Sequence, residues 1–309
     1  MRVLVLMEVG ADVRVPPDRD PRSGRVREEW LVREIDPASA AAFELALKLK
    51  IGRSDVDVTA VHLGPAGAES RLRRLIARGA DRAVRVWDEE LSGTQAPGKA
   101  VALASAVQAA GFDLVLAGAA GVLDAGGQLG VLLAQHLGVP CVTQAAAISL
   151  AHGEAGAGSL QVTRALDRGF KERVEVPLPA VVTVSAGSSP GETVPSPASA
   201  VALLAAQACV VPVWDLADLG VPPERLRQTE HVLKYGLPGP PRPRLHPLVA
   251  PDPTLPAFDR ILKLVQGSVK RREGRVVRQP AERIVEEIFA TLRDEGWLDH
   301  LRPGTSGSE

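Results

Sequence analysis

Apolar runs and amphipathic segments alternate four times through the first 140 residues of the chain. Runs rich in Val, Leu and Ala predict buried strands at residues 3–7, 56–63, 83–87 and 114–117. Segments with helical spacing follow them at residues 37–50, 69–78, 97–110 and from near 125 to 138. This repeat predicts an α/β fold, a doubly wound and mostly parallel sheet of the Rossmann-like kind with right-handed crossovers.

The first of these helices has a clear start signal. Asp36 can cap the helix, and Pro37 fits the first helical position, where its missing N–H costs nothing. Residues 8–34 before it are charged and interrupted by prolines, so we expect a loop with room for a short hairpin.

The pattern changes after residue 141. Residues 142–150, 160–166 and 173–176 alternate in a way that predicts an antiparallel addition to the sheet, and residues 178–184 read as a further buried strand. Residues 198–208 predict an apolar helix without charges, which we expect to be covered on most sides, by this chain or by another.

The C-terminal region predicts an extended arm. Residues 236–256 are dense in proline and indicate a semi-rigid connector, followed by helices at 258–265 and 280–296. An isolated amphipathic helix is marginal in water, so the last one needs a surface to lie on. A partner subunit could provide that surface.

Residues 111–140 combine a short strand, a glycine-rich loop and a helix. Bare backbone at a helix start lets an anion approach the free amide groups, which makes a phosphate site. The loop fits no strict dinucleotide or Walker motif. A turn that only lets strand and helix pack closely is an equally good interpretation of this stretch alone.

Composition narrows the function classes. The formal charge is -1, from 36 basic and 37 acidic residues. The chain as a whole therefore lacks the excess of positive charge that is typical of nucleic-acid-binding proteins. The two cysteines have no Cys-x-x-Cys spacing, so neither a metal cluster nor a redox dithiol is indicated. No apolar run reaches the roughly 18 residues of a membrane-spanning helix. We therefore expect a cytoplasmic protein that is not embedded in a membrane.

The order of several segments resembles the β subunit of electron transfer flavoproteins over about residues 1–221, and the final helix is also similar. The matching segments are VTAVHLGP (58–65), RGADRA (78–83), GQLG (127–130), VTRALDRG (162–169), LPAVVTV (178–184) and residues 214–221. The resemblance implies a nucleotide-binding domain at 1–221. It also implies that residues 222–309 form a connector and arm that contact the partner subunit.

In that family the β subunit is a non-catalytic half of a heterodimer. It holds an adenine nucleotide, usually AMP, and its α subunit partner carries the redox-active FAD. The heterodimer shuttles electrons from flavin dehydrogenases to a quinone reductase or another acceptor. The resemblance thus implies an electron carrier more than an enzyme in its own right, with no catalytic residue and no metal in this chain.

If the nucleotide contacts of the family are carried over to this chain position by position, the nucleotide would contact strand ends, one helix start and the glycine loop. These positions are Leu6, Asp36, Pro37, Ala38, Ser39, Leu63, Gly118, Ala119, Ala120, Gly121, Val122, Asp124, Gly126, Gly127, Gln128, Leu129 and Gly130. The family segment that docks dehydrogenases would fall near residues 185–206.

The chain departs from the family at several of these places. An aromatic residue usual near the flavin is absent at residues 36–39, and the basic stretch near the docking segment is replaced by the apolar residues 198–208. Two alternatives stay open. The site could hold a second FAD, in an electron-bifurcating flavoprotein, or the chain could be a stand-alone adenine-nucleotide-binding regulatory module.

Overall fold

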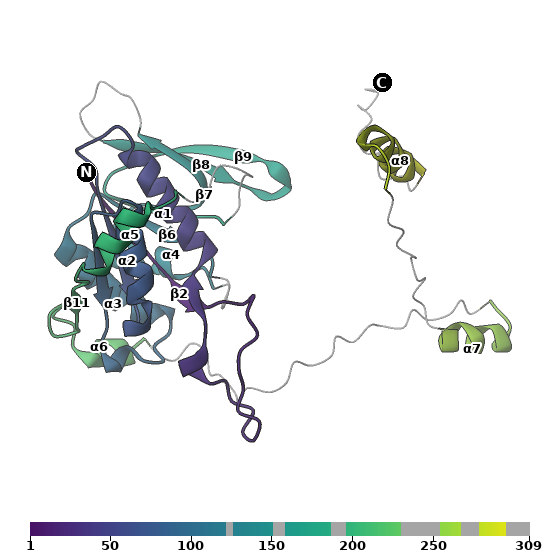
Figure 1. Ribbon diagram of the computed structural model, residues 1–309, viewed down its shortest axis with the longest axis horizontal. Helices are drawn as coiled ribbons and strands as arrows, with labels where there is room; N and C mark the ends of the chain where they lie inside the picture. The colour runs from purple at the N-terminus through teal and green to yellow at the C-terminus, as the bar shows by residue number, and fades with distance from the viewer. Residues whose placement is uncertain (122–125, 151–157, 187–195, 230–253, 267–277, 295–309) are drawn as a thin grey trace. The chain divides into compact units, whose positions relative to one another are not determined.

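A computed structural model describes residues 1–121, 126–150, 158–186, 196–229, 254–266 and 278–294. It divides the chain into two units, Met1–Pro238 and Gly239–Glu309. The first unit contains the sheet and most of the helices (Figure 1).

The first unit is built on a sheet of nine strands in the order β11-β5-β4-β1-β6-β10-β7-β8-β9. The strands are β1 (Arg2–Leu6), β4 (Asp57–Leu63), β5 (Arg82–Val86), β6 (Leu114–Gly118), β7 (Cys141–Leu150), β8 (Ser159–Ala165), β9 (Lys171–Pro177), β10 (Ala180–Val184) and β11 (Val213–Trp214). Pairing is parallel from β11 to β7 and antiparallel for β7 with β8 and β8 with β9. The α/β fold with a mostly parallel sheet and an antiparallel addition is therefore confirmed.

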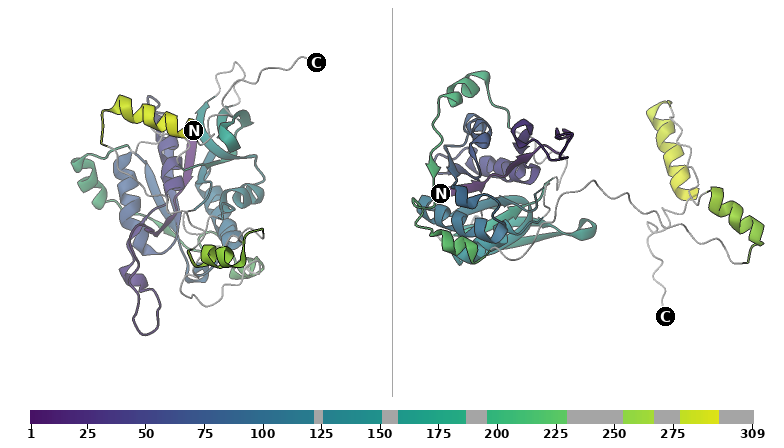
Figure 2. Two further views of the ribbon diagram at one scale, coloured as in Figure 1. Left: turned by 90° about the vertical axis from the view of Figure 1, so that its right-hand side faces the viewer. Right: turned by 90° about the horizontal axis from the view of Figure 1, so that it is seen from below.

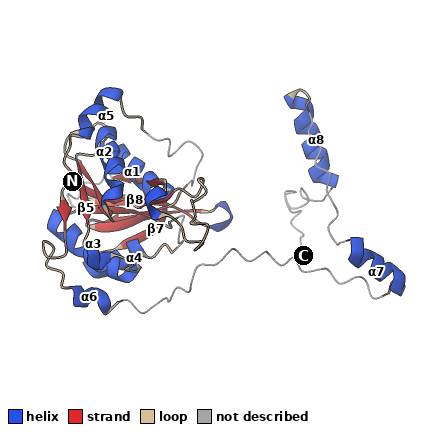
Figure 3. Cartoon of the chain, turned by 60° about the horizontal axis from the view of Figure 1, so that its bottom comes forward, coloured by secondary structure: helices blue, strands red, loops and turns tan. Residues whose placement is uncertain are grey.

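Helices cover both faces of this sheet, as Figure 3 shows. They are α1 (Pro37–Lys50), α2 (Glu69–Arg78), α3 (Ala96–Ala110), α4 (Leu129–Leu137), α5 (Ala200–Gln207) and α6 (Pro223–Arg227). Short 3-10 turns occur at η1 (Glu28–Trp30), η2 (Ala66–Ala68), η3 (Glu89–Leu91) and η4 (Asp167–Gly169). One apolar layer gathers residues of α1 and α2, and a second one gathers residues of α3 and α4.

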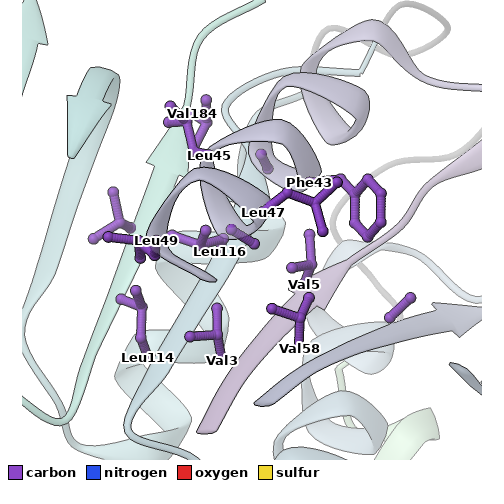
Figure 4. Packing of buried hydrophobic residues seen from close by; sticks show 14 of the residues in the cluster. Val3, Val5, Phe43, Leu45, Leu47, Leu49, Val58, Leu114, Leu116 and Val184 are labelled. Carbon is purple, nitrogen blue, oxygen red and sulfur yellow. The ribbon is translucent and has the colours of Figure 1, made fainter. Parts of the chain in front are cut away.

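The layer under α1 belongs to the larger of the two clusters of buried apolar residues (Figure 4). Phe43 is fully buried, and the strand residues beneath α1 are Val and Leu with almost no exposure. The residues labelled in Figure 4 come from α1 and four parallel strands: Val3, Val5, Phe43, Leu45, Leu47, Leu49, Val58, Leu114, Leu116 and Val184. Strands buried on both faces explain why the sequence shows continuous apolar runs instead of alternation.

Three local features refine the sequence-based expectations. The expected loop, which has room for a short hairpin, contains a two-stranded antiparallel sheet of β2 (Val9–Ala11) and β3 (Arg33–Ile35), which extends one residue past the expected range. Helix α4 begins at Leu129 and not near Ala125, because Gly127 has a φ of +57, outside the helical region. Among the described residues of α5 only Ala206 is buried, whereas Val201 and Leu204 are exposed, so the described part of the chain does not itself supply the cover expected for this helix.

The second unit contributes two described helices, α7 (Ala257–Gln266) and α8 (Ala281–Asp294). Phe258 and Ile261 on α7 are exposed, and Val285, Ile288 and Phe289 on α8 are each about half exposed. Both predicted tail helices are thus present. Most of the expected connector, residues 236–256, lies outside the described residues.

Candidate nucleotide site

The carboxyl ends of three neighbouring parallel strands meet at one edge of the sheet. β1 pairs with β4 on one side, where Leu6 is level with Val61, and with β6 on the other, where Val5 is level with Leu116. The strand ends Leu6, Leu63 and Gly118 consequently lie along the same edge. In doubly wound sheets ligands bind beyond this edge, at the point where the strand order reverses, and here that point lies between β1 and β6.

Two buried polar side chains fix the start of α1, and one of them ties it to the residues that follow β1. The Asp36 carboxylate accepts hydrogen bonds from the amides of Ala38 at 2.8 Å and Ser39 at 3.4 Å, which confirms it as the helix cap. The Ser39 hydroxyl accepts one from the Glu8 amide at 3.1 Å. Both side chains hold the protein together here, so their expected nucleotide contacts would have to use remaining lone pairs.

The glycine loop after β6 packs directly on this helix start. A Cβ atom added at Gly118 would lie 3.0 Å from the Cβ of Ala38 and 3.1 Å from the amide nitrogen of Ser39. A residue with a side chain would push the loop and α1 apart. The structure therefore brings Gly118, at the start of the predicted loop, beside Ala38 and Ser39.

Two further glycines fix the path of the loop into α4. A Cβ at Gly127 would lie 2.4 Å from the carbonyl oxygen of Ala119, and one at Gly130 would lie 2.5 Å from Cγ2 of Thr183. Close packing thus accounts for the missing side chains at these positions. It also leaves bare backbone at the start of α4, whose first amides have no acceptor within the helix. Such a start fits a phosphate group.

The remaining predicted positions are partly described. Ala119 is buried, Ala120, Gly126 and Gln128 are exposed, and the Gln128 side chain makes no cap bond to α4. Val122 and Asp124 lie outside the described residues. Of the predicted loop, the structure therefore describes the two ends, residues 118–121 and 126–130.

His62 at the end of β4 is buried and neutral. Its Nδ1 donates to the carbonyl oxygen of Met7 at 2.7 Å, which ties β4 to the residue that follows β1. Burial lowers its pKa to about 4, and the nearby charges of Arg85, Lys99 and Arg33 add to this shift. A Cβ at Gly64 would lie 2.4 Å from its Nε2. The side chain therefore serves the packing of this edge.

Sequence reasoning missed a cavity of about 310 Å³ beside the start of α1. The strands β2 and β3, together with the three residues that directly follow β2, form most of its wall. Its lining consists of Glu8, Gly10, Ala11, Asp12, Val13, Arg14, Glu34, Ile35, Asp36 and Pro37. The Arg14 guanidinium hydrogen-bonds to Asp12 and lowers the pKa of that carboxyl to about 2, so the Asp12 carboxyl is ionised at neutral pH. Four of the lining residues are acidic, so the lining disfavours a phosphate group.

Over the described ranges, no group of three or more His, Cys, Asp or Glu residues is placed to hold a metal ion. None of the described helices is both long enough and apolar enough to cross a bilayer.

Comparison with a family model gives one match. The model described as "Electron transfer flavoprotein domain" matches residues 25–219, which is more than half of the chain. The matched range includes α1, the glycine loop and α5.

Individual relatives agree with this match. The chain is 31% identical over 163 residues to "Electron transfer flavoprotein subunit beta" of Methylophilus methylotrophus, covering 52% of the chain and 61% of the relative. The protein with the same description in Clostridium acetobutylicum is 31% identical over 173 residues, covering 56% and 62%. The chain thus spans about three fifths of the length of these two curated relatives.

A third relative comes from a named complex. "Caffeyl-CoA reductase-Etf complex subunit CarD" of Acetobacterium woodii is 28% identical over 225 residues, covering 72% of the chain and 82% of the relative.

Proposed function

We propose, since the chain belongs to the β subunit family of electron transfer flavoproteins, that it is the β subunit of a heterodimer. In this proposal it binds AMP as a structural nucleotide and pairs in the cytoplasm with an α subunit that carries FAD. The heterodimer passes electrons from flavin dehydrogenases to a quinone reductase or a similar acceptor. The chain itself does no catalysis.

One observation supports the nucleotide site more than any other. The glycine loop lies against the start of α1 so closely that a Cβ at Gly118 would meet Ala38 and Ser39 at 3.0 to 3.1 Å. This contact unites two segments that are 80 residues apart in sequence at the reversal point of the sheet. A nucleotide between the carboxyl ends of β1 and β6 would touch both.

Backbone groups would make most of the contacts with AMP. The phosphate would lie at the amides that begin α4, and the base would lie near the strand ends at Leu6 and Leu63. One helix start contributes roughly 0.3–1 kcal/mol to a nearby anion. Micromolar affinity corresponds to about 8 kcal/mol, so the other contacts must supply most of the binding free energy.

Two surfaces would meet protein partners. The α subunit would cover the apolar face of α8, where Val285, Ile288 and Phe289 are half exposed. The dehydrogenases would dock at α5, where Val201 is 77% and Leu204 is 67% exposed. Apolar side chains at such exposure are typical of interaction sites.

Co-expression with an α subunit tests this function. The neighbouring gene is the first place to seek one. The proposal expects a stable 1:1 heterodimer in sedimentation and rapid bleaching of its FAD absorbance by a reduced flavin dehydrogenase. A chain that stays alone at micromolar concentration with every candidate α subunit would contradict it.

A second candidate function is a bifurcating flavoprotein with a second FAD in place of AMP. The cavity beside Asp36 and Pro37 favours it, because a flavin ring needs room next to the nucleotide site that AMP does not. The similarity to CarD is a further reason to test for a complex with a reductase. Two flavins per heterodimer would support this candidate, and one would rule it out.

A further inference from the structure

Helix α5 lies beside α2 at the periphery of the first unit, as the views of Figure 1 and Figure 2 show. Only Ala206 of this helix is buried, whereas Val201 and Leu204 point into solvent and Val210 after it is 84% exposed. A helix that buries so little apolar area gains little from packing. Polar contacts at its two ends must therefore hold it in place.

The first of these contacts is made by Glu44 on α1. Its carboxylate is 4% exposed, and its Oε2 accepts hydrogen bonds from the amide of Ser196 at 3.0 Å and from the Ser196 hydroxyl at 2.9 Å. Ser196 lies three residues before Ser199, whose hydroxyl caps α5. A buried carboxylate thus fixes the chain just before the helix starts.

Arg78, the last residue of α2, completes this contact. Its Nη2 pairs with Oε1 of Glu44, while its Nε donates to the carbonyl oxygen of Ser196 at 3.0 Å. Its guanidinium carbon lies 5.2 Å from the ring centroid of Phe43, a cation–π distance. One planar guanidinium therefore binds both the carboxylate and the backbone, which a point-like ammonium does not do in the same way.

A second arginine of α2 holds the other end of α5. Nε of Arg73 donates to the carbonyl oxygen of Cys209 at 3.1 Å, and its Nη2 pairs with Glu69 at 3.2 Å. Both ends of the exposed helix are thus attached to one neighbouring helix. The apolar residues between them are held in place at both ends, although little of the described part of the chain covers them.

We propose that Glu44 and Arg78 are positioning residues for partner docking, because they hold Ser196 and thereby set where the apolar side chains of α5 lie. This inference rests on the proposed function, in which dehydrogenases dock at α5. A buried ion pair adds little net stability over an apolar pair of the same shape, whereas it fixes geometry. The ion pair of Glu44 and Arg78 thereby sets the position of the exposed apolar side chains of α5.

Arg78→Lys is the decisive variant, tested in the heterodimer with its α subunit. Lysine keeps the charge beside Glu44 but cannot form the two-sided contact with Ser196. Arg82→Lys is the matched control, because Arg82 pairs with Asp57 at 2.9 Å on the surface of the same unit. The measurements are amide hydrogen exchange over residues 196–209, the KM and kcat for a flavin dehydrogenase that reduces the wild-type heterodimer, and the FAD content.

For Arg78→Lys we expect exchange over 196–209 and the KM for the dehydrogenase to rise about tenfold, as for loss of one charge-assisted hydrogen bond. The kcat and the FAD content should match the wild type, as should every property of Arg82→Lys. The amide oxygen of Gln in Glu44→Gln can still accept a hydrogen bond from Ser196. This variant should therefore retain part of the protection from hydrogen exchange that Glu44→Ala loses.

Two results overturn the inference. Exchange in Arg78→Lys equal to that in Arg82→Lys would show that the contact does not hold α5. Raised exchange with an unchanged KM would show that the position of α5 is irrelevant to docking. Failure of the wild-type chain to pair with any α subunit refutes the proposed function instead, and it is seen before any variant is compared.

Discussion

Replacing Gly127 by alanine tests whether the glycine loop must follow its observed path to hold a nucleotide. Gly127 has a φ of +57, and an added Cβ would lie 2.4 Å from the carbonyl oxygen of Ala119. The left-handed conformation costs a residue with a Cβ about 1–2 kcal/mol. The clash adds to this cost, because a backbone oxygen cannot rotate away as a side chain can, so the loop has to move.

Gly138→Ala is the matched control at the other end of the same helix. Gly138 caps α4 with a φ of +67, and nothing lies within 4 Å of an added Cβ. This variant should carry the conformational cost without the clash. Its melting temperature should fall by about 2–4 °C per kcal/mol in a unit of this size. Its nucleotide binding should equal that of the wild type.

The assay combines urea unfolding with titration of AMP into the nucleotide-free heterodimer. For Gly127→Ala we expect a larger loss of stability than for Gly138→Ala and an AMP affinity at least about tenfold weaker, which is roughly 1.4 kcal/mol. If Gly127→Ala kept wild-type affinity, the loop would be a packing turn only, and the reasoning from its path to a nucleotide would be refuted.

Three further outcomes follow from the structure. Asp36→Ala removes the cap of α1 and should lower the unfolding free energy by about 1 kcal/mol in urea titrations, with Asp36→Asn much closer to the wild type. The pKa of His62 is lowered to about 4 in the folded chain. As the pH falls, the imidazole of the unfolded chain therefore binds a proton at a higher pH than the imidazole of the folded chain. Stability should therefore fall, by up to roughly 3 kcal/mol, as the pH drops from about 6.5 to about 4. His62→Gln should remove this component, and a slope equal to that of the wild type would contradict the assignment. Phe289→Asp should weaken the heterodimer in sedimentation more than Phe258→Asp does, since only α8 is assigned to the α subunit, and equal effects would reject that assignment.

The fold could be predicted from the sequence because the patterns that indicate strands and helix starts lie within short segments of the chain. Continuous apolar runs at residues 3–7 and 114–117 are what a strand buried on both faces requires, and Asp36 with Pro37 marks a helix start without any tertiary information. The structure confirms both. The antiparallel addition followed from alternation in residues 142–176.

The parts that sequence reasoning missed depend on contacts between distant residues. The start of α4 at Leu129 is set by the positive φ of Gly127, and a row of glycines does not reveal which one adopts it. The role of Glu44 depends on Ser196, 152 residues away, and a buried glutamate inside an apolar helix gives no sign of its partner.

Counting the nucleotides released from the purified heterodimer tests the central claim most directly. The complex would be denatured, and AMP and FAD would be separated and quantified against the protein concentration. The account predicts one AMP and one FAD per heterodimer. A heterodimer that releases FAD but no adenine nucleotide from the β subunit site would contradict it.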